Sequence, residues 1–582
     1  MLVKEASQRL ARRTGVAAAL LGSGARRGIL GGSRTPAVFA ADATRARADG
    51  GRRASTTAAG EPQPQAPRSS NYALAFALGS MVSGGLAYYF ASSDTTESNK
   101  TNTDFNTQYG SPEDFKKAVK ELQEAFKHDE DALSTDEDEL ERHGLANFDM
   151  HPGTIPSVVV FPTSTEDVVK IVKIAVKYRM PVVPFSGGTS LEGHFLPPSI
   201  GGISIDMHRM DKIVEIHEAD SDVVCQPGVK WMDLNDYLKK KGIPLFFPLD
   251  PGPGATLGGM LSTGCSGTNA VRYGTARAEW FLNATVVLPS GEVIKTRRRA
   301  RKSSAGFDTT KLFIGAEGTL GIVTEVTIRL APVLQTNVAV VQFPDVQKAT
   351  EAVIELVNSG IGIQCVELVD DMFMKGTNMY GMSPRKWPEK DSLYLKFQGP
   401  TPRALQENAE VAKKITSKYG ATGFTFARNE KEAEDLWTDR KNAVYSGLAM
   451  VPGSKAWGTD VCVPVSRLPE LVYETKKDLA AHGIMSTIIG HVGDGNFHAL
   501  LLYRTPEESA IAYEAGKRIV KRAIDLDGTC TGEHGVGLGK KGWLYEELGE
   551  GTIELMRTIK KAIDPLNLFN PGKLYPDQPS KK

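Results

Sequence analysis

The chain has 582 residues, too many for one ordinary domain, and its hydrophobic content of 41% is typical of a folded core. Lysine plus arginine and aspartate plus glutamate both count 69, so the global charge does not indicate a nucleic-acid-binding protein. The five cysteines are odd in number and form no C-x-x-C pair, which argues against a disulfide framework and a thiolate zinc site. We therefore expect two or three folded units with reduced cysteines.

The first 70 residues form a basic leader. They contain twelve Lys or Arg residues and only four acidic residues, and the remainder is mostly Ala, Gly, Ser and Thr. This composition is typical of a mitochondrial presequence. The alternative is a disordered basic tail.

An uncharged segment follows at 72–91, YALAFALGSMVSGGLAYYFA. Twenty helical residues at ~1.5 Å each span about 30 Å, the hydrocarbon thickness of a bilayer. Tyr72, Tyr88 and Tyr89 lie at its ends, where aromatic belts occur. The segment predicts one transmembrane helix, with a buried core helix as the alternative. Basic residues before it and acidic residues after it predict that the leader faces the matrix of the inner mitochondrial membrane and the rest faces the intermembrane space.

Beyond this segment the sequence predicts a polar linker and a charged helical segment over 92–150. From 156 onward, short apolar strands alternate with amphipathic helices, and no repeat is present. This texture indicates an α+β fold. The individual elements predicted are a strand at 158–161, a helix at 165–178 capped by Thr165, a strand at 181–185, and, after a boundary near Ala331–Pro332, a strand at 338–343 and a helix at 346–359.

Three glycine-rich segments occupy 184–194, 251–275 and 315–328. None fits a G-x-G-x-x-G fingerprint between a strand and a helix, and no Walker A motif occurs. Consecutive small residues can point backbone N–H groups at an anion such as a pyrophosphate. Taken singly, each segment is equally compatible with simple turns.

The order and spacing of these segments, together with the C-terminal sequence DPLNLFNPGKLYP at 564–576, resemble the vanillyl-alcohol-oxidase/PCMH-type family of FAD-binding proteins. The resemblance runs from about Val158 to the C-terminus. It implies a PCMH-type FAD-binding domain at 151–332, an α+β substrate (cap) domain at 333–560, and a tail at 561–582 that returns to the flavin domain.

The same resemblance implies which residues contact the flavin. Some members of the family bind flavin covalently through a histidine, but His194 ends the first segment here instead of lying inside it. We therefore expect non-covalent FAD. Lys573 in the tail is a further candidate contact. The implied FAD contacts are Pro184, Ser186, Gly187, Gly188, Thr189, Ser190, Pro251, Gly254, Ala255, Thr256, Gly258, Gly259, Thr263, Ser266, Gly267, Gly321, Val323 and Asn570.

A second group of motifs contains histidines flanked by glycines: HVGDGNFH at 491–498 and GEHGVG at 532–537. A hairpin through the first motif would bring His491 back toward His498. Two imidazoles and the carboxylate of Glu533 leave open positions on a divalent ion, as catalytic metal sites require. The alternative for any single histidine is a hydrogen-bonded structural residue.

These motifs resemble the D-2-hydroxyacid dehydrogenase branch of the same family. The resemblance implies that His491, His498 and Glu533 bind Zn²⁺ or Mn²⁺, between which the ligand set does not discriminate, and that His534 is the base. It also implies that Arg440 binds the substrate carboxylate, a task that suits a guanidinium.

The branch implies FAD-dependent oxidation of a D-2-hydroxy acid, with hydride transfer to flavin N5 and metal-assisted loss of the hydroxyl proton. Relatives that act on D-2-hydroxyglutarate carry a lysine just before the position of Asp460, whereas this chain has Gly458 and Thr459. A short acid, D-lactate, is therefore the expected substrate, and the intermembrane location favours cytochrome c as the acceptor. The alternatives are D-2-hydroxyglutarate or glycolate oxidation, an alkyl-glycerone-phosphate synthase, a metal-dependent hydrolase with purely structural glycine loops, and a non-catalytic membrane scaffold.

Overall fold

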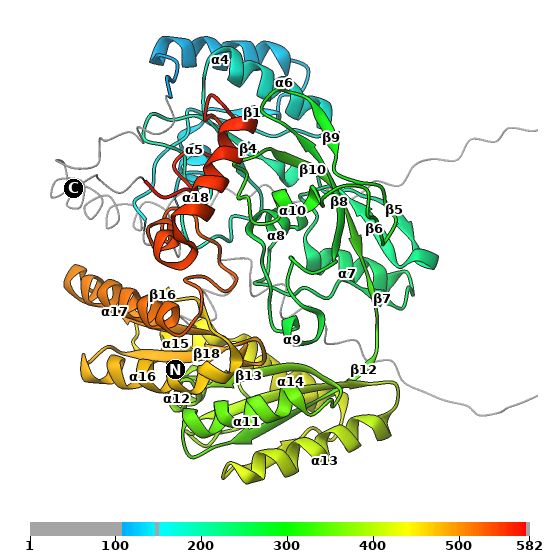
Figure 1. Ribbon diagram of the computed structural model, residues 1–582, viewed down its shortest axis with the longest axis vertical. Helices are drawn as coiled ribbons and strands as arrows, with labels where there is room; N and C mark the ends of the chain where they lie inside the picture. Colours follow the sequence, from blue (N-terminus) through cyan, green and yellow to red (C-terminus); the bar gives the residue numbers. More distant parts are fainter. Residues whose placement is uncertain (1–106, 146–150, 578–582) are drawn as a thin grey trace, which may run out of the picture. The chain divides into compact units, whose positions relative to one another are not determined.

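Three β-sheets and a two-stranded ribbon form the framework of the described chain, residues 107–145 and 151–577 of this computed structural model. In Figure 1 the first two sheets lie in the upper half, and the largest sheet, with its helices, lies below. The predicted leader, 1–70, and the predicted membrane span, 72–91, lie outside the described residues. Within the described ranges, no helix combines the length and apolar character needed to cross a membrane.

The first sheet has four strands in the order β1-β2-β4-β3. Strands β2, β4 and β3 run parallel, and β1 pairs antiparallel with β2. Helices α4 and α6 bury apolar stripes against this sheet, with Leu122 and Ile171 fully buried. The bounds are α4 (Pro112–Ala125), β1 (Leu133–Ser134), α5 (Glu137–Arg142), β2 (Val158–Val160), α6 (Thr165–Lys177), β3 (Val182–Phe185), β4 (Ile203–Asp206) and η1 (Met207–Arg209).

The second sheet is antiparallel, with five strands in the order β5-β6-β10-β8-β9. Short helices α8, α9 and α10 lie in its long connections, and the ribbon β7–β11 closes its lower end. The bounds are β5 (Ile213–His217), η2 (Glu218–Asp220), β6 (Asp222–Cys225), α7 (Trp231–Lys240), β7 (Leu245–Phe246), α8 (Leu257–Thr263), α9 (Ala270–Tyr273), β8 (Phe281–Val287), β9 (Val293–Lys295), α10 (Thr310–Phe313), β10 (Ile322–Arg329) and β11 (Ala331–Pro332).

The third sheet is antiparallel, with eight strands and the path β15-β12-β14-β13-β18-β19-β16, from which β17 pairs with β19. Strand β12 shows why both faces are covered: Ala339 and Val341 enter one apolar core, and Val338 and Val340 enter the other. Helices α11, α13, α16 and α17 cover the first face, and α12, α14 and α15 cover the second.

The elements of this third sheet follow one another over 335–525. Their bounds are β12 (Gln335–Gln342), α11 (Val346–Asn358), β13 (Ile363–Val369), α12 (Asp371–Tyr380), β14 (Ser392–Gly399), α13 (Pro402–Lys418), β15 (Thr422–Phe426), α14 (Glu430–Lys441), α15 (Ala443–Met450), β16 (Lys455–Gly458), β17 (Val461–Cys462), η3 (Val465–Arg467), α16 (Leu468–Ala481), β18 (Ser486–Gly490), η4 (Val492–Asp494), β19 (Asn496–Tyr503) and α17 (Pro506–Asp525).

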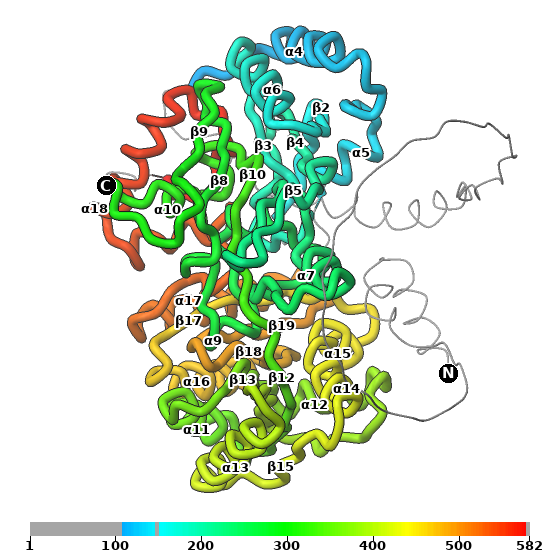
Figure 2. The backbone as a smooth tube through the Cα atoms, turned by 90° about the vertical axis from the view of Figure 1, so that its right-hand side faces the viewer, coloured from blue at the N-terminus to red at the C-terminus, as the bar shows by residue number. Residues whose placement is uncertain are grey.

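The C-terminal segment leaves the large sheet and packs on the first half of the chain. After η5 (Lys541–Trp543), helix α18 (Leu544–Ile563) places its last turns against the core of the five-stranded sheet, and Figure 1 and Figure 2 both show it in the half of the molecule that holds the first two sheets. The residues after it pair with β3: the Val182 N–H donates to the Leu568 carbonyl, and the Asn570 N–H donates to the Val182 carbonyl, both at 2.8 Å.

The elements predicted from periodicity agree with the structure to within a few residues. The strands at 158–161 and 181–185 correspond to β2 and β3, and the helix at 165–178 corresponds to α6. The predicted cap is wrong by one position: Ser164, not Thr165, accepts the hydrogen bond from the Asp167 N–H. Ser164 has the extended backbone of an N-cap, whereas Thr165 is already helical.

Candidate functional site

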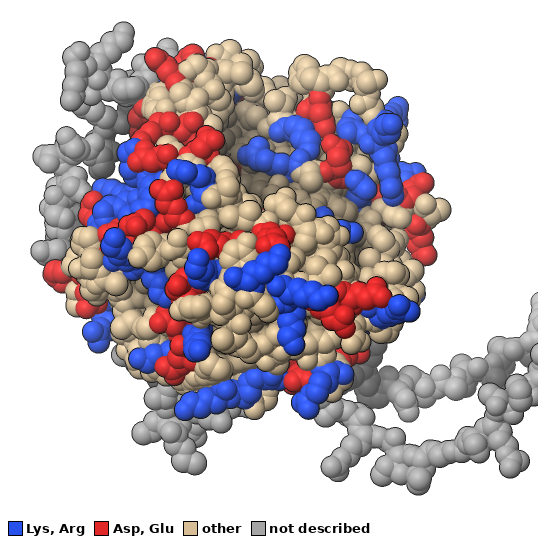
Figure 3. Space-filling view, turned by 60° about the horizontal axis from the view of Figure 1, so that its bottom comes forward, with Lys and Arg blue, Asp and Glu red and all other residues tan. Residues whose placement is uncertain are grey.

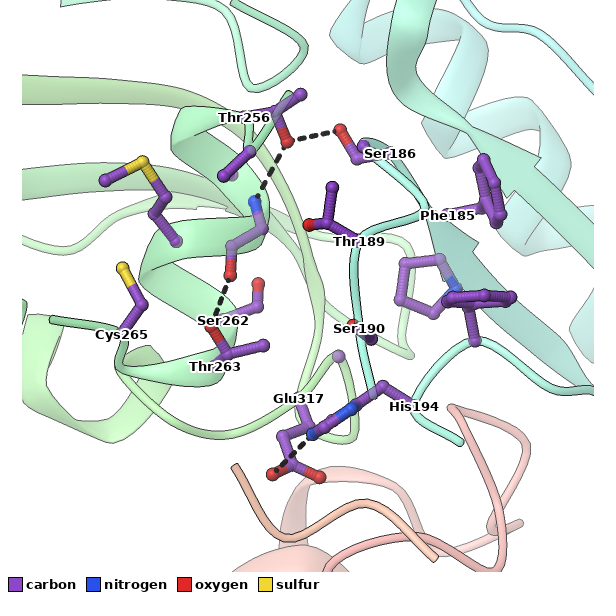
Figure 4. A pocket seen from close by; sticks show the side chains of 18 of the residues that line it. Phe185, Ser186, Thr189, Ser190, His194, Thr256, Ser262, Thr263, Cys265 and Glu317 are labelled. Atoms are coloured by element: carbon purple, nitrogen blue, oxygen red, sulfur yellow. Dashed lines mark hydrogen bonds and ion pairs between the residues drawn. The ribbon is translucent and has the colours of Figure 1, made fainter. Parts of the chain in front are cut away.

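A cavity of about 290 Å³ lies where the three glycine-rich segments meet, and we call it the glycine cavity. Figure 4 shows the first segment, after β3, facing α8 of the second segment across this space. Mostly small residues and backbone form its wall. The lining residues are Pro184, Phe185, Ser186, Gly187, Gly188, Thr189, Ser190, Leu191, His194, Phe195, Met207, Pro227, Pro251, Gly252, Ala255, Thr256, Gly258, Gly259, Met260, Ser262, Thr263, Cys265, Glu317, Gly318, Gly321, Ile322, Val323, Glu533, His534 and Asn570.

Direct contacts fix the distance between the first two segments. The hydroxyls of Ser186 and Thr256 are hydrogen-bonded at 2.7 Å, and Thr256 also accepts the Gly259 N–H as the cap of α8 (Figure 4). A Cβ placed on Gly187 would lie 2.7 Å from the Gly254 carbonyl oxygen, closer than real Cβ contacts occur. Glycine at 187 therefore allows the two backbones to approach each other.

The third segment and the C-terminal tail are joined by one amide. The Asn570 Nδ2 donates to the His194 carbonyl at 2.9 Å and to the Glu317 carbonyl at 2.7 Å. A Cβ on Gly318 would overlap the ring of Pro184, so the first and third segments also pack backbone against side chain. The glycine cavity is thus assembled from four separate parts of the chain.

The structure places most of the predicted FAD contacts on the wall of this cavity. Gly254, Ser266 and Gly267 are the exceptions within the described lining. The Gly254 carbonyl packs against Gly187, and the Ser266 hydroxyl donates to Glu533 Oε2 at 2.8 Å. A Cβ on Gly267 would meet Asp250. These three residues hold the segments in place and do not face the space.

Two charged residues on the wall escaped the sequence prediction. His194 and Glu317 are both buried, and His194 Nε2 lies 3.2 Å from Glu317 Oε1 (Figure 4). The sequence offered one signal for Glu317: it is an acidic residue among the glycines of the third segment. Lys573, a candidate contact from the tail, does not line the cavity, because its ammonium donates to the Leu196 carbonyl at 2.6 Å.

The second group of predicted residues converges at the end of the cavity. Antiparallel pairing of β18 and β19 turns the chain between His491 and His498, whose ring centroids lie 5.4 Å apart. Glu533 Oε1 lies 3.0 Å from His491 Nε2 and 3.4 Å from His498 Nε2. We call His491, His498, Glu533 and His534 the histidine cluster.

The donor set of this cluster suits a divalent cation. One ligand atom each from His491, His498 and Glu533 lies within 4.8 Å of the other two, and all three are largely removed from solvent. Burial raises the pKa of Glu533, but the charges of and hydrogen bonds with the two histidines outweigh it and hold that pKa well below its usual range. Two imidazoles and an ionised carboxylate are the usual ligands of catalytic zinc, and they also suit manganese.

Glu367 of β13 supports this set from behind and was not predicted. Its side chain is fully buried and accepts from His491 Nδ1 at 2.9 Å, which leaves His491 Nε2 directed at Glu533. A carboxylate in this position fixes the tautomer and the orientation of a metal-binding histidine. Nothing in the local sequence identifies it, since Glu367 lies far from both histidine motifs.

Arg440 of α14 lies beside Glu367. Its Nη2 donates to Glu367 Oε2 at 2.6 Å, and its buried Nε has no hydrogen-bond partner among the described residues. The guanidinium predicted for the substrate carboxylate is therefore anchored through Glu367 to the histidine cluster.

Asp460 organises the loop that carries Glu533 and His534. Its Oδ2 accepts the N–H groups of both residues at 2.9 Å and the Thr531 hydroxyl at 2.8 Å, and its Oδ1 accepts from Asn496 at 2.8 Å. Asp460 with His498 and His534 forms a second group with metal-ligand spacing. Because the oxygens of Asp460 already accept these bonds, His491, His498 and Glu533 are the better ligand set.

His534 has the properties of a neutral base. Its ring stacks parallel to that of His498, with centroids 5.1 Å apart and an interplanar angle of 10°. Burial, aided by the charges of His498 and Lys540 and opposed by Asp460, lowers the pKa of His534 to about 4. His534 and Glu533 both line the glycine cavity, so the two predicted sites form one continuous space.

Comparison with known proteins agrees with this arrangement. The family model described as "FAD binding domain" matches residues 156–297, and the model described as "FAD linked oxidases, C-terminal domain" matches residues 335–574. Together they cover most of the described chain, and the glycine cavity lies largely within the first match.

Curated relatives extend this match over most of their own length. "D-lactate dehydrogenase (cytochrome) 1, mitochondrial" of Saccharomyces cerevisiae is 43% identical over 80% of this chain and 81% of the yeast protein. "D-lactate dehydrogenase (cytochrome), mitochondrial" of Kluyveromyces lactis is 41% identical over 86% and 90%, and the Arabidopsis thaliana protein of the same name is 45% identical over 77% and 78%. The chain therefore belongs to the FAD-linked oxidases, in the family of the D-lactate dehydrogenases (cytochrome).

Solved structures support the fold. A 4-ethylphenol oxidase from Gulosibacter chungangensis, 20% identical, superposes with a TM-score of 0.67 over 82% of this chain and 99% of its own. An alkyldihydroxyacetonephosphate synthase, 21% identical, superposes with a TM-score of 0.61 over 81% and 87%. These likenesses identify the PCMH-type fold of the flavin domain.

Proposed function

We propose that this chain oxidises D-lactate to pyruvate with FAD as the oxidant. The observation that carries the proposal is that Glu533 and His534 line the same cavity as the glycine-rich segments. A group that removes a proton thus lies beside the space that fits a flavin. The names of the relatives supply the substrate.

The residues divide the chemistry between them. His534, neutral at physiological pH, removes the proton of the 2-hydroxyl. The residues that line the glycine cavity would hold FAD, which would supply the acceptor for the hydride that leaves C2. His491, His498 and Glu533 would hold a Zn²⁺ or Mn²⁺ ion, which supplies a Lewis acid that lowers the pKa of the hydroxyl. The products are pyruvate, reduced flavin and a protonated His534.

The substrate carboxylate is assigned to Arg440, whose buried Nε lacks a partner among the described residues. A guanidinium can donate to Glu367 through one nitrogen and to a second carboxylate through others. A Cβ placed on Gly458 would meet no other atom within 4 Å, and glycine has no cationic side chain that could bind a second substrate carboxylate. This arrangement favours a short monocarboxylate.

The decisive experiment is anaerobic addition of D-lactate to the purified protein while the flavin spectrum is recorded. We expect bleaching of the oxidised flavin bands by D-lactate and slower bleaching by L-lactate and D-2-hydroxyglutarate. Bleaching by another acid but not by D-lactate would overturn the substrate. A colourless protein would instead favour a metal-dependent hydrolase whose glycine segments are structural.

Glycolate oxidation is the second candidate. The glycolate oxidase subunit GlcD of Bacillus subtilis is 31% identical over 74% of this chain and 91% of its own length. Steady-state rates with glycolate and D-lactate at equal concentration separate the two functions. A larger kcat/KM for glycolate would favour the second candidate.

We propose that FAD binds without a covalent bond. His194 ends the first glycine-rich segment instead of lying inside it, and its ring nitrogen Nε2 lies 3.2 Å from Glu317 Oε1, which supports this proposal. Acid precipitation of the protein should release the yellow cofactor into the supernatant. Colour retained in the pellet would contradict this proposal.

The relatives' names give a cytochrome as the acceptor, and the proposed intermembrane location favours cytochrome c. Figure 3 shows one face of the molecule on which Lys or Arg and Asp or Glu side chains are interspersed. Salt screens the attraction between acidic side chains and a basic acceptor, so we expect reduction of cytochrome c to slow as ionic strength rises. A rate that does not respond to salt would favour another acceptor.

The proposed location is the inner mitochondrial membrane, with residues 1–70 as presequence, 72–91 as the span and the catalytic domains in the intermembrane space. The proposed domains are 92–150 as linker and helical segment, 151–332 for flavin, 333–560 for substrate, and 561–582 as the returning tail. Mitoplasts treated with protease should lose the C-terminal domains, and their protection would refute this topology.

A further inference from the structure

The loop that carries His534 is held from two sides. From the cap side, Asp460 accepts the N–H groups of Glu533 and His534. From the flavin side, Glu317 Oε1 accepts the Val536 N–H at 2.7 Å, and its Oε2 accepts the Gly537 N–H at 2.9 Å. The two carboxylates therefore bracket the base along the backbone.

Glu317 is itself fixed by the glycine cavity. Its backbone has φ +54, a left-handed conformation that is uncommon for a side chain of this size. The Asn570 amide donates to its carbonyl, its N–H donates to the Ser262 carbonyl at 2.8 Å, and its carboxylate faces His194, so both its backbone and its side chain contact other lining residues or the His534 loop. Such a conformation persists only where the surroundings over-determine it, which makes a functional role worth testing.

The packing around the contact between Glu317 and the His534 loop leaves no room for a side chain at position 535. Gly535 has φ +88, and a Cβ there would lie 2.6 Å from His194 Nε2 and 3.0 Å from Glu317 Oε1. Burial raises the pKa of Glu317, but His194 and the two backbone N–H groups lower it further, so the carboxylate is ionised. Hydrogen bonds to an ionised acceptor are stronger than neutral ones.

We propose that Glu317 is a positioning residue that sets the place of His534 from the wall of the glycine cavity, so that filling the cavity and placing the base are coupled. Glu317 does not act on the substrate. Its effect on turnover rests on the proposed function of His534, whereas its effect on the loop does not.

The first test measures the loop itself by amide hydrogen exchange on the full-length holoprotein and on protein stripped of FAD. We expect FAD to slow exchange in peptides that cover 531–540. Glu317→Gln replaces one acceptor oxygen by an NH2 donor and removes the charge, so one of the two backbone N–H groups loses its acceptor and exchange there should accelerate about 10- to 100-fold, the factor that corresponds to one charge-assisted hydrogen bond. Exchange equal to that of the parent protein would overturn the proposal, even if D-lactate proved not to be the substrate.

A matched control is Glu325→Gln on β10. Glu325 is partly exposed and pairs with Lys295 at 3.1 Å, remote from the His534 loop in its contacts. It should leave both exchange and turnover unchanged. If Glu317→Gln does not accumulate as folded protein, Glu317→Asp keeps the charge but is shorter by one methylene, and it should show a smaller acceleration at the same amides.

The second test is a double-mutant cycle with His534→Ala. Alone, Glu317→Gln should lower kcat about 10- to 100-fold, because the base is misplaced, with less change in KM. In the His534→Ala background it should cost little further turnover, since a residue that acts through another shows no additive effect. An equal loss in both backgrounds would assign Glu317 a purely structural role and overturn the proposal.

Discussion

The glycine cavity and the histidine cluster adjoin each other, yet they are built from different materials. The cavity is formed mainly by backbone and small side chains, which are held in register by close packing, as at Gly187 and Gly254, and by hydrogen bonds of Thr256 and Asn570. The cluster is formed by ionisable side chains whose positions depend on buried partners such as Glu367 and Asp460. This difference fits the proposed function, in which the cavity binds the cofactor through its shape and the cluster acts on the substrate.

Removal of the base gives the largest expected effect and tests this division directly. His534→Ala should lower the rate of flavin reduction by D-lactate about 10²–10⁴-fold, because general base catalysis typically contributes that much. Flavin content should stay at the parent level, since the cavity remains intact. Anaerobic stopped-flow absorbance measures both. A loss below tenfold would assign proton removal to another group.

Removal of a metal ligand ranks next. His498→Ala should lose the bound ion and slow flavin reduction roughly 10²–10³-fold, because a Lewis acid supplies several kcal/mol of transition-state stabilisation. Elemental analysis and rates before and after chelation measure the two effects. His482→Ala, at the exposed end of α16, is the matched control. Full activity in metal-free protein would show that the cluster works by hydrogen bonds alone.

The buried carboxylate behind His491 should have a smaller effect. Glu367→Gln keeps the size of the side chain but no longer fixes the imidazole and Arg440 by charge, so metal affinity should fall about 10- to 100-fold. Competition with a metal indicator measures the affinity. Glu434→Gln, exposed on α14, should change nothing. An unaltered affinity in Glu367→Gln would mean that His491 is oriented by the hairpin without help.

A change in the glycine cavity should cost least and should spare the chemistry. Gly187→Ala places a methyl group against the Gly254 carbonyl, and overpacking of about 1–2 kcal/mol corresponds to a roughly 5- to 30-fold loss of FAD affinity. At saturating FAD the reduction rate should return to the parent value. Gly551→Ala, in open space on α18, is the control. A rate that stays low at saturation would contradict the division between the two regions.

Sequence patterns predicted the secondary-structure elements and the residues that converge in the histidine cluster better than they predicted the partners of those residues. The strands and helices near 158–185 and 338–359 follow from periodicity, and the histidines stand out because glycines flank them. Glu367 and Asp460 could not be assigned their roles, because each acts on a motif far away in sequence through contacts that only the folded sheet creates. Their burial and hydrogen bonds, not their neighbours in the chain, distinguish them from ordinary acids.

The same limit applies within the glycine cavity. Segment positions were predicted correctly, but Gly254, Ser266 and Gly267 face away from the space and support other residues. Whether a residue of these segments faces the cavity depends on turns of a few residues, and a local pattern of small residues does not determine the course of those turns. Glu317 was overlooked because it is a single acidic residue within a glycine-rich segment, and a single residue gives no periodic pattern.

The returning tail has a consequence for the order in which the protein matures. Asn570 lies seven residues after the end of α18 at Ile563 and supplies the amide that joins the first and third glycine segments, and Phe569 forms a bridge with Val182. During synthesis these residues emerge after all three glycine-rich segments. The flavin domain therefore cannot complete its binding surface until the chain has been made beyond Asn570, and stable loading of the cofactor has to wait for that segment.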